Sequence, residues 1–253
     1  MIILVKKRAV LLYSLLIFLM LVIGIACTSK KTRNIKAYYL PLEELTDGLV
    51  YEYNAINNDQ LPPFYWYFRI TKIKDQIILS SQYFDYQFRI QQLSKEVVVT
   101  NGVILNEFSL FRTDTLTGKQ TQNPVRVELD NAFPFEVTDS TGVFLYKLYW
   151  QDSENPNQKI RLIRNRHFMG DATYRYQNKS VDCVRFLVKE LLEVDEEGFQ
   201  EFNYQGTELY AKGIGLVYFK KVIGENVAQE YELVDRYDMA TLEQKFKESL
   251  GEE

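Results

Sequence analysis

Apolar and polar side chains alternate along most of the chain outside its N-terminal part, in short runs that turn residues separate. Leu49, Tyr51 and Tyr53, for example, occupy every second position of one run. Successive side chains of a strand point to opposite faces, so this spacing predicts a strand with one buried face. Asn101-Gly102 lies between two such runs and predicts a two-residue hairpin turn. The recurrence of runs and turns indicates a meandering antiparallel sheet.

The last part of the chain changes to a helical period. Met239, Leu242, Phe246 and Leu250 are three, four and four positions apart, so they fall on one face of an α-helix. Asp238 stands immediately before this pattern, where an N-cap residue is expected. The chain is therefore predicted to be mainly β, with one C-terminal helix.

The first residues differ from the rest in having no acid and a long apolar run. Positions 6–8 are basic, positions 9–26 are apolar or weakly polar, and Gly-Ile-Ala precedes Cys27. This pattern resembles the lipoprotein signal peptides of Gram-negative bacteria, particularly those of the Bacteroidetes. The resemblance implies that residues 1–26 are a signal peptide and that Cys27 is the lipid attachment site, carrying acyl chains such as palmitate. The alternative is a retained membrane anchor, since the run is at the short end of the roughly 17–25 residues that a spanning helix needs.

The leader also sets the expected division of the chain. Residues 27–37 are polar and basic and are predicted to be a lipidated tether, and residues 38–253 a single antiparallel β domain. Thr28 follows the lipidated cysteine, and by resemblance to enterobacterial sorting this residue favours the outer membrane. We therefore expect a cell-envelope protein that is held to the outer membrane through its N-terminal lipid.

Composition and charge narrow the classes of function. Hydrophobic residues make up 46% and charged residues 25% of the chain, which is typical of a folded globular protein. The net charge is −4 and the leader contributes only basic residues, so the remaining body is more acidic still. Nonspecific binding of nucleic acid needs a concentrated positive face. The acidic body therefore disfavours nucleic acid as a partner. With Cys27 acylated, Cys183 has no cysteine to pair with, and its apolar surroundings predict a buried thiol.

Residues with catalytic or metal-binding chemistry are few. His167 is the single histidine, which excludes a His-rich zinc site, and no Gly-x-Ser-x-Gly motif is present. The chain has 34 acidic residues, so close acidic pairs such as those at 195–197 arise by chance and predict only a solvated hairpin tip. We expect no catalytic residues, no metal and no cofactor, and hence no enzyme.

The aromatic run at residues 64–68 is the most distinctive feature of the body. If it is a strand, Tyr65 and Tyr67 share one face, and Phe64, Trp66 and Phe68 share the other. One face belongs to the core, so the second would line a cavity or meet a partner. Tyr65, Trp66 and Tyr67 are therefore the candidate ligand or partner surface. The alternative is a strand that the protein covers on both sides.

The C-terminal half resembles a family of bacterial lipoproteins of unknown function. The residues that carry the resemblance are 176–186, the stretch Tyr-Ala-Lys-Gly-Ile-Gly-Leu-Val at 210–217, and 231–234. The resemblance implies a curved antiparallel sheet or the half-open barrel of the periplasmic lipoprotein carriers and outer-membrane lipoprotein receptors. The dinucleotide-binding alternative for Gly213 and Gly215 fails, because no third glycine follows and a strand rather than a helix comes next.

These observations lead to a ranked set of expectations. The first is a noncatalytic outer-membrane lipoprotein that binds an apolar ligand, such as a lipid, or a protein partner. The second is a structural component of an envelope or secretion assembly. The third is a glycan hydrolase, which requires two carboxylates across a cleft, one of them buried with a raised pKa.

Overall fold

The computed structural model describes the folded body of the chain. Residues 32–251 are described, except for residues 57, 59, 115–116, 139–142, 154 and 226. The predicted signal peptide (1–26), Cys27 and Thr28 lie outside the described residues. Thr32–Glu253 form one compact unit.

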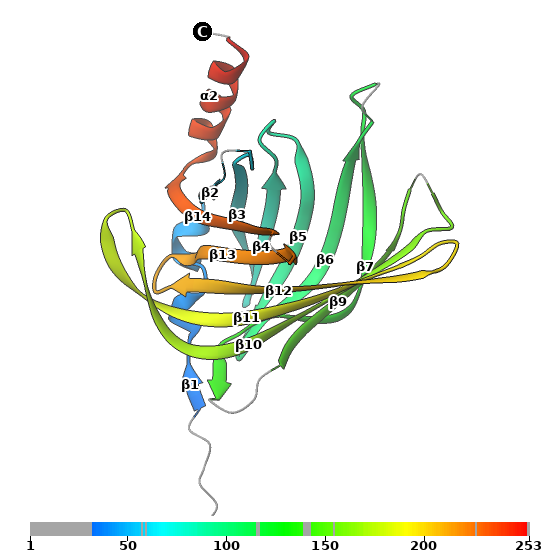
Figure 1. Cartoon of the computed structure of the whole chain (residues 1–253). Coiled ribbons are helices and arrows are strands. Elements are labelled where there is room, and N and C mark those ends of the chain that lie inside the picture. The colour runs from blue at the N-terminus through cyan, green and yellow to red at the C-terminus, as the bar shows by residue number, and fades with distance from the viewer. Residues whose placement is uncertain are drawn as a thin grey trace, which may run out of the picture. The chain divides into compact units, whose positions relative to one another are not determined.

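The described residues form a closed antiparallel barrel of 12 strands, in which each strand is hydrogen-bonded to a neighbour on either side (Figure 1). The barrel strands are β2 (Leu49–Ala55), β3 (Phe64–Ile73), β4 (Gln76–Phe84), β5 (Ile90–Val99), β6 (Gly102–Thr113), β7 (Gln120–Pro134), β9 (Val143–Gln151), β10 (Lys159–Tyr176), β11 (Lys179–Asp195), β12 (Phe199–Ala211), β13 (Gly215–Gly224) and β14 (Val227–Tyr237). The predicted mainly β fold is confirmed.

The sheet closes where its first and last strands meet. Leu233 of β14 pairs with Tyr53 of β2, and Tyr231 pairs with Ala55. The resemblance left open a curved sheet or a half-open barrel, and this pairing gives a closed one. Because β2 and β14 pair with each other, neither strand has an unpaired edge.

The hairpin predicted at Asn101-Gly102 forms, but it is shifted by one residue. Val99 pairs with Gly102, so the turn consists of Thr100 and Asn101, and Gly102 is already the first residue of β6. A Cβ at Gly102 would lie 2.6 Å from the carbonyl oxygen of Phe133 in β7. Glycine is therefore needed here for close approach of two backbones and not for the turn itself.

The folded body begins earlier than the predicted boundary at residue 38. β1 (Thr32–Asn34) pairs with β8 (Glu136–Thr138), and η1 (Lys36–Tyr38) and η2 (Leu42–Leu45), two short 3₁₀ helices, follow. Ile35 is fully buried, and its amide donates to the carbonyl of Phe135 at 2.8 Å. Residues 32–37, predicted to be tether, are thus part of the folded unit. Their polar sequence gave no sign of this, because a two-stranded pairing needs no apolar alternation.

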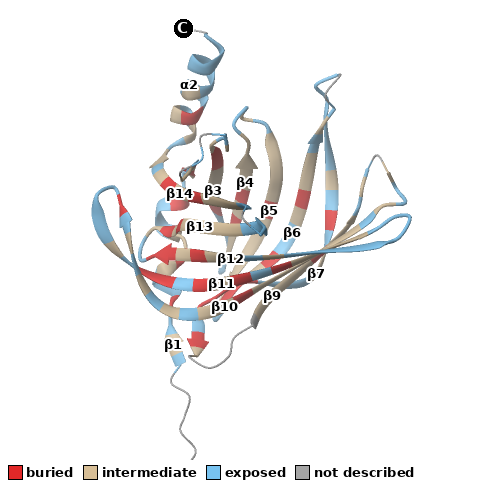
Figure 2. Ribbon diagram, in the orientation of Figure 1, coloured by how far each residue is buried: buried red, intermediate tan, exposed pale blue. Residues whose placement is uncertain are grey.

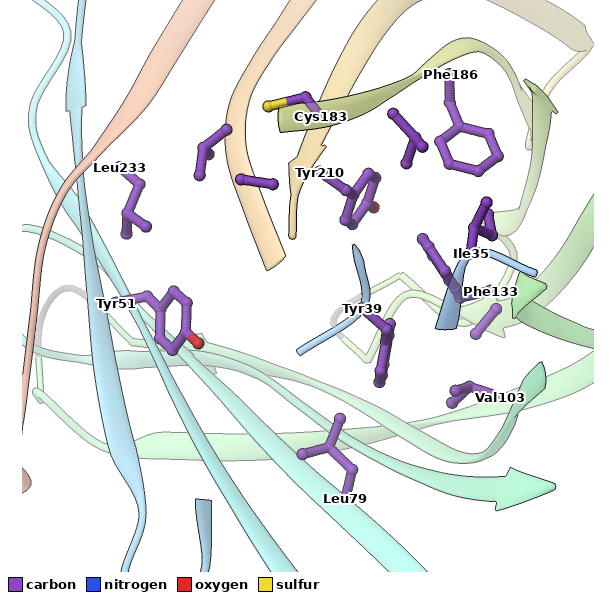
Figure 3. Close-up of a cluster of buried hydrophobic side chains, with 14 of the residues drawn as sticks. Ile35, Tyr39, Tyr51, Leu79, Val103, Phe133, Cys183, Phe186, Tyr210 and Leu233 are labelled. Carbon is purple, nitrogen blue, oxygen red and sulfur yellow. The ribbon is translucent and has the colours of Figure 1, made fainter. Parts of the chain in front are cut away.

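Buried residues recur along the barrel strands (Figure 2), and aliphatic and aromatic side chains pack together in the core (Figure 3). Tyr51, Phe186 and Ile35 are fully buried, and Figure 3 shows Tyr39 among the core side chains. The thiol of Cys183 is buried and free, and burial raises its pKa to about 11. This thiol therefore stays protonated at neutral pH, as its apolar sequence context predicted.

The C-terminal helix α2 (Met239–Leu250) has the predicted N-cap. The carboxylate of Asp238 accepts a hydrogen bond from the amide of Thr241 at 2.8 Å. Leu242 is buried against Val50 and Tyr65 on the outside of the barrel, whereas Leu250 is 57% exposed. The helix is therefore anchored through its first half. Within the described part of the chain, no helix is long and apolar enough to cross a membrane.

Candidate functional site

The aromatic run that the sequence singled out forms β3, and its two faces have different surroundings. Phe64, Trp66 and Phe68 point into the barrel, where they line a cavity of about 430 Å³. Tyr65 and Tyr67 point outward and pack in a separate cluster with α2. The three candidate residues Tyr65, Trp66 and Tyr67 are therefore not brought together, because neighbouring side chains of a strand alternate between faces.

The outward pair is covered by the protein itself. The ring of Tyr65 stacks on Phe88 with 5.0 Å between ring centroids, and Leu242 of α2 packs against the same cluster. Tyr67 lies over Gly48, where an added Cβ would come within 2.0 Å of the tyrosine hydroxyl. Of the three candidates, only Trp66 lines the cavity.

One wall of the cavity is aromatic. Trp66 and Phe68 stack with ring centroids 5.7 Å apart, and Phe219 and Tyr231 stack at 5.3 Å. These rings share the wall with others from β2, β3 and β4. The aromatic residues that line this wall are Tyr53, Phe64, Trp66, Phe68, Tyr83, Phe219 and Tyr231.

A charged wall, centred on the buried Glu208 of β12, adjoins the aromatic wall, because Glu208 pairs with Phe219 of β13. The Nε of Arg166 donates to Glu208 Oε2 at 2.7 Å, and Arg164 also donates to this carboxylate. The hydroxyl of Tyr210 donates to Glu208 Oε2 at 3.0 Å, and Nη1 of Arg166 donates to the carbonyl of Ala132 at 2.8 Å. Glu208 is only 2% exposed, so these partners replace the water that it has lost.

A second carboxylate extends the charged wall away from the cavity. The Nε of Arg164 lies 3.3 Å from Glu190, and the Nζ of Lys221 lies 2.5 Å from the same carboxylate. Arg164, Glu190, Glu208 and Lys221 also line a smaller neighbouring cavity of about 190 Å³. We call Arg164, Arg166, Lys221, Glu190 and Glu208 the ion-pair cluster.

The two carboxyl groups that face the main cavity have opposite pKa shifts. Burial would raise the pKa of Glu208, but Arg166 and Arg164 outweigh burial and lower it to about 2. Glu96 of β5 accepts a hydrogen bond from the hydroxyl of Tyr39 at 2.6 Å. Burial raises the pKa of Glu96, and the hydrogen bond from Tyr39 and the charge of Arg166 offset only part of that rise.

Sequence reasoning missed the charged residues of this site. Arg164 and Arg166 occupy alternate positions of β10, and Glu208 shares the inward face of β12 with Tyr210. The alternate spacing of the two arginines was the available signal. His167 does not line the cavity. Within the described residues, no three His, Cys, Asp or Glu side chains are grouped so that they could hold a metal ion.

Comparisons with known proteins give a fold but no family. No protein-family model matches this chain, and no curated protein matches it in sequence. A solved structure of a candidate lipoprotein from Parabacteroides distasonis matches with a TM-score of 0.52 and 15% identity, over 78% of this chain and 95% of that one.

Two further solved structures match with lower TM-scores. A candidate exported protein with a YmcC-like fold from Bacteroides fragilis has 14% identity and a TM-score of 0.47, over 76% of this chain and 97% of that one. The hypothetical lipoprotein YmcC from Escherichia coli has 11% identity and a TM-score of 0.31, over 77% of this chain and 86% of that one. At these identities the likeness concerns the fold alone, and this chain shares the fold of the Parabacteroides distasonis protein.

Proposed function

We propose that this protein is a noncatalytic lipoprotein of the cell envelope, anchored to the outer membrane through an acylated Cys27, that binds a ligand with an apolar body inside its barrel. The observation that carries this proposal is the cavity of about 430 Å³ beside an aromatic wall. Sites for small molecules are mostly apolar hollows of roughly 300–1,000 Å³ with a few polar groups.

The cavity is unusual for the interior of a protein. Cores are normally packed to the density of organic crystals, and voids larger than a water molecule are few. Here the aromatic rings of Trp66, Phe68 and Phe219 are only partly buried although they point into the barrel. A ligand with an apolar body would cover these rings and so gain the free energy of burying apolar surface on both molecules.

Energy transfer from Trp66 tests this proposal directly. The chain has two tryptophans, so Trp150→Phe leaves Trp66 as the single donor. We expect the neutral fluorophore N-phenyl-1-naphthylamine to bind saturably and to accept energy from Trp66. Phe68→Ala should weaken this binding, whereas Tyr67→Ala, on the outer face of the same strand, should not. Absence of saturable binding to the folded protein would contradict the proposal.

The anchor is tested separately, because Cys27 lies outside the described residues. Cells fed labelled palmitate should incorporate the label into the full chain but not into the Cys27→Ala variant, and the labelled protein should fractionate with outer membranes. Two or three acyl chains anchor a protein firmly, since each buried CH₂ contributes about 0.8 kcal/mol. A wild-type chain without label that keeps residues 1–26 would mean a retained membrane anchor instead.

A glycan hydrolase is the second candidate, because Glu96 and Glu208 face one cavity with pKa shifts in opposite directions. The weakness of this candidate is Glu208, whose two oxygens are held by Arg164, Arg166 and Tyr210. A carboxylate with a pKa of about 2 is a poor base and is shielded from water. Release of reducing sugar from cell-wall or capsular glycans that Glu96→Gln abolishes would favour the hydrolase over the binding protein.

A further inference from the structure

We propose that the ligand of the cavity is an amphipathic monoanion, whose apolar body lies on the aromatic wall and whose carboxylate is bound by Arg164 and Arg166. This inference rests on the proposed function and adds the chemical class of the ligand. The placement of the rings and arginines, the charge balance of the ion-pair cluster and the N–H groups that its arginines leave unused support it.

The inward rings of β3 and the inward arginines of β10 face each other across the barrel. In the order of the closed sheet, β3 is the sixth strand from β10 in either direction, so the two strands lie on opposite sides (Figure 1). Trp66 and Phe68 project inward from β3, and Arg164 and Arg166 project inward from β10. A molecule that spans the cavity would therefore meet rings at one end and guanidinium groups at the other.

The ion-pair cluster has more positive than negative groups. Its three cations are Arg164, Arg166 and Lys221, and its two carboxylates are Glu190 and Glu208. One positive charge is therefore left over within the cluster. Each carboxylate is shared between two cations, Glu208 by Arg164 and Arg166 and Glu190 by Arg164 and Lys221, so a bound anion of charge −1 would balance the cluster.

Glu96 is the other carboxyl group on the cavity wall and could supply this charge. Its hydrogen-bond donor is the hydroxyl of Tyr39, and no ion pair joins it to Arg164 or Arg166 in the described residues. Burial raises its pKa. Since Glu96 is hydrogen-bonded to Tyr39 and makes no ion pair with the cluster, we assign the missing charge to the ligand and treat Glu96 as a hydrogen-bonding group.

The arginines retain donors that the protein does not use. A guanidinium group has five N–H bonds. Arg166 donates three hydrogen bonds, two to Glu208 and one to the carbonyl of Ala132. Arg164 makes two, one to Glu208 and one to Tyr146, beside its ion pair with Glu190. The donor fork of a guanidinium matches the planar geometry of a carboxylate.

The experiment compares ligands with one apolar chain and different end groups. The concentrations of decanoate, decanol and decyltrimethylammonium that displace bound N-phenyl-1-naphthylamine from the wild-type full chain are measured at about neutral pH. A charge-assisted hydrogen bond contributes more than about 1.4 kcal/mol, so decanoate should displace the fluorophore at about tenfold lower concentration than decanol. Decyltrimethylammonium should be weaker than both.

Variants then show which side chain causes the preference for decanoate over decanol. Arg166→Met leaves the two cluster carboxylates matched by Arg164 and Lys221, so it should fold and bind decanoate and decanol equally. Arg161→Met is the matched control, because Arg161 lies on the same strand but pairs with Glu193 outside the cavity, and it should keep the preference. Glu96→Gln, a neutral isostere, should also keep it.

The outcomes separate the two proposals. Binding of the fluorophore with equal displacement by decanoate and decanol would overturn the monoanion and leave the apolar-ligand proposal intact. Failure of the fluorophore to bind would overturn the proposed function itself. If Arg166→Met does not fold, the wild-type comparison still decides. A preference that Glu96→Gln removes and Arg166→Met retains would assign the ligand's polar end to Glu96 and overturn the inference.

Discussion

Neutralising Glu208 should destabilise the protein strongly. In the variant Glu208→Gln, Arg164 and Arg166 lose the carboxylate that both share, and two like charges remain close together in a buried site. The pKa of Glu208 falls from 4.5 to about 2, and each pKa unit corresponds to 1.36 kcal/mol, which gives about 3 kcal/mol. Breaking a buried ion pair by removing one partner typically costs about 3–5 kcal/mol.

The effect should depend on pH in a defined direction. A carboxyl group whose pKa is lowered on folding stabilises the protein above its unfolded pKa, and this contribution is lost as the pH falls through the folded value. Urea unfolding at about pH 7 should therefore show a deficit of about 3 kcal/mol for Glu208→Gln relative to wild type. The deficit should shrink as the pH falls from 4.5 towards 2, because wild-type Glu208 then becomes neutral as well.

Two further variants control this prediction. Glu107→Gln removes a carboxylate from the exposed pair with Lys95 and should cost less than about 1 kcal/mol. Adding Arg166→Met to Glu208→Gln should restore part of the lost stability, since it removes the repulsion between Arg164 and Arg166. A deficit below about 1 kcal/mol for Glu208→Gln, or one that does not change with pH, would refute the reasoning.

Two more predictions concern the elements that cover β3 from outside. Gly48→Ala should cost about 1–3 kcal/mol more in urea unfolding than Gly118→Ala, because both glycines have positive φ but only Gly48 has a neighbour, Tyr67, where the Cβ would lie; equal losses would show that this contact is unimportant. Asp238→Ala should lower stability by about 1 kcal/mol and speed amide hydrogen exchange in the first turn of α2, since it removes the N-cap; unchanged exchange would mean that packing alone holds the helix.

The sequence predicted the local structure of the barrel well, because strands and helices differ in the period of their apolar residues. The strand that contains Tyr51 and Tyr53 and the helix capped by Asp238 were both found in this way. Closure of the sheet through β2 and β14 joins residues from opposite ends of the chain, and no local pattern encodes that pairing. β1 was missed for a different reason, since its three residues, Thr32–Asn34, include no apolar side chain.

The candidate site was predicted only in part. Alternation showed that β3 has two aromatic faces, but it could not tell which face α2 covers. Of the candidates Tyr65, Trp66 and Tyr67, only Trp66 lines the cavity. The charged wall depends on β10 and β12 bringing Arg164, Arg166 and Glu208 together, which is a property of the closed barrel. A cavity arises where inward side chains fail to fill the space, and this cannot be read from the chain alone.

Native mass spectrometry of the mature full chain, purified from its own cells and freed of detergent, tests the central claim most directly. The account predicts a noncovalent mass of one small anion per chain, which tandem dissociation releases as a carboxylate and which Phe68→Ala reduces. A bare chain that also takes up no added decanoate or N-phenyl-1-naphthylamine would contradict the claim that the barrel holds a ligand.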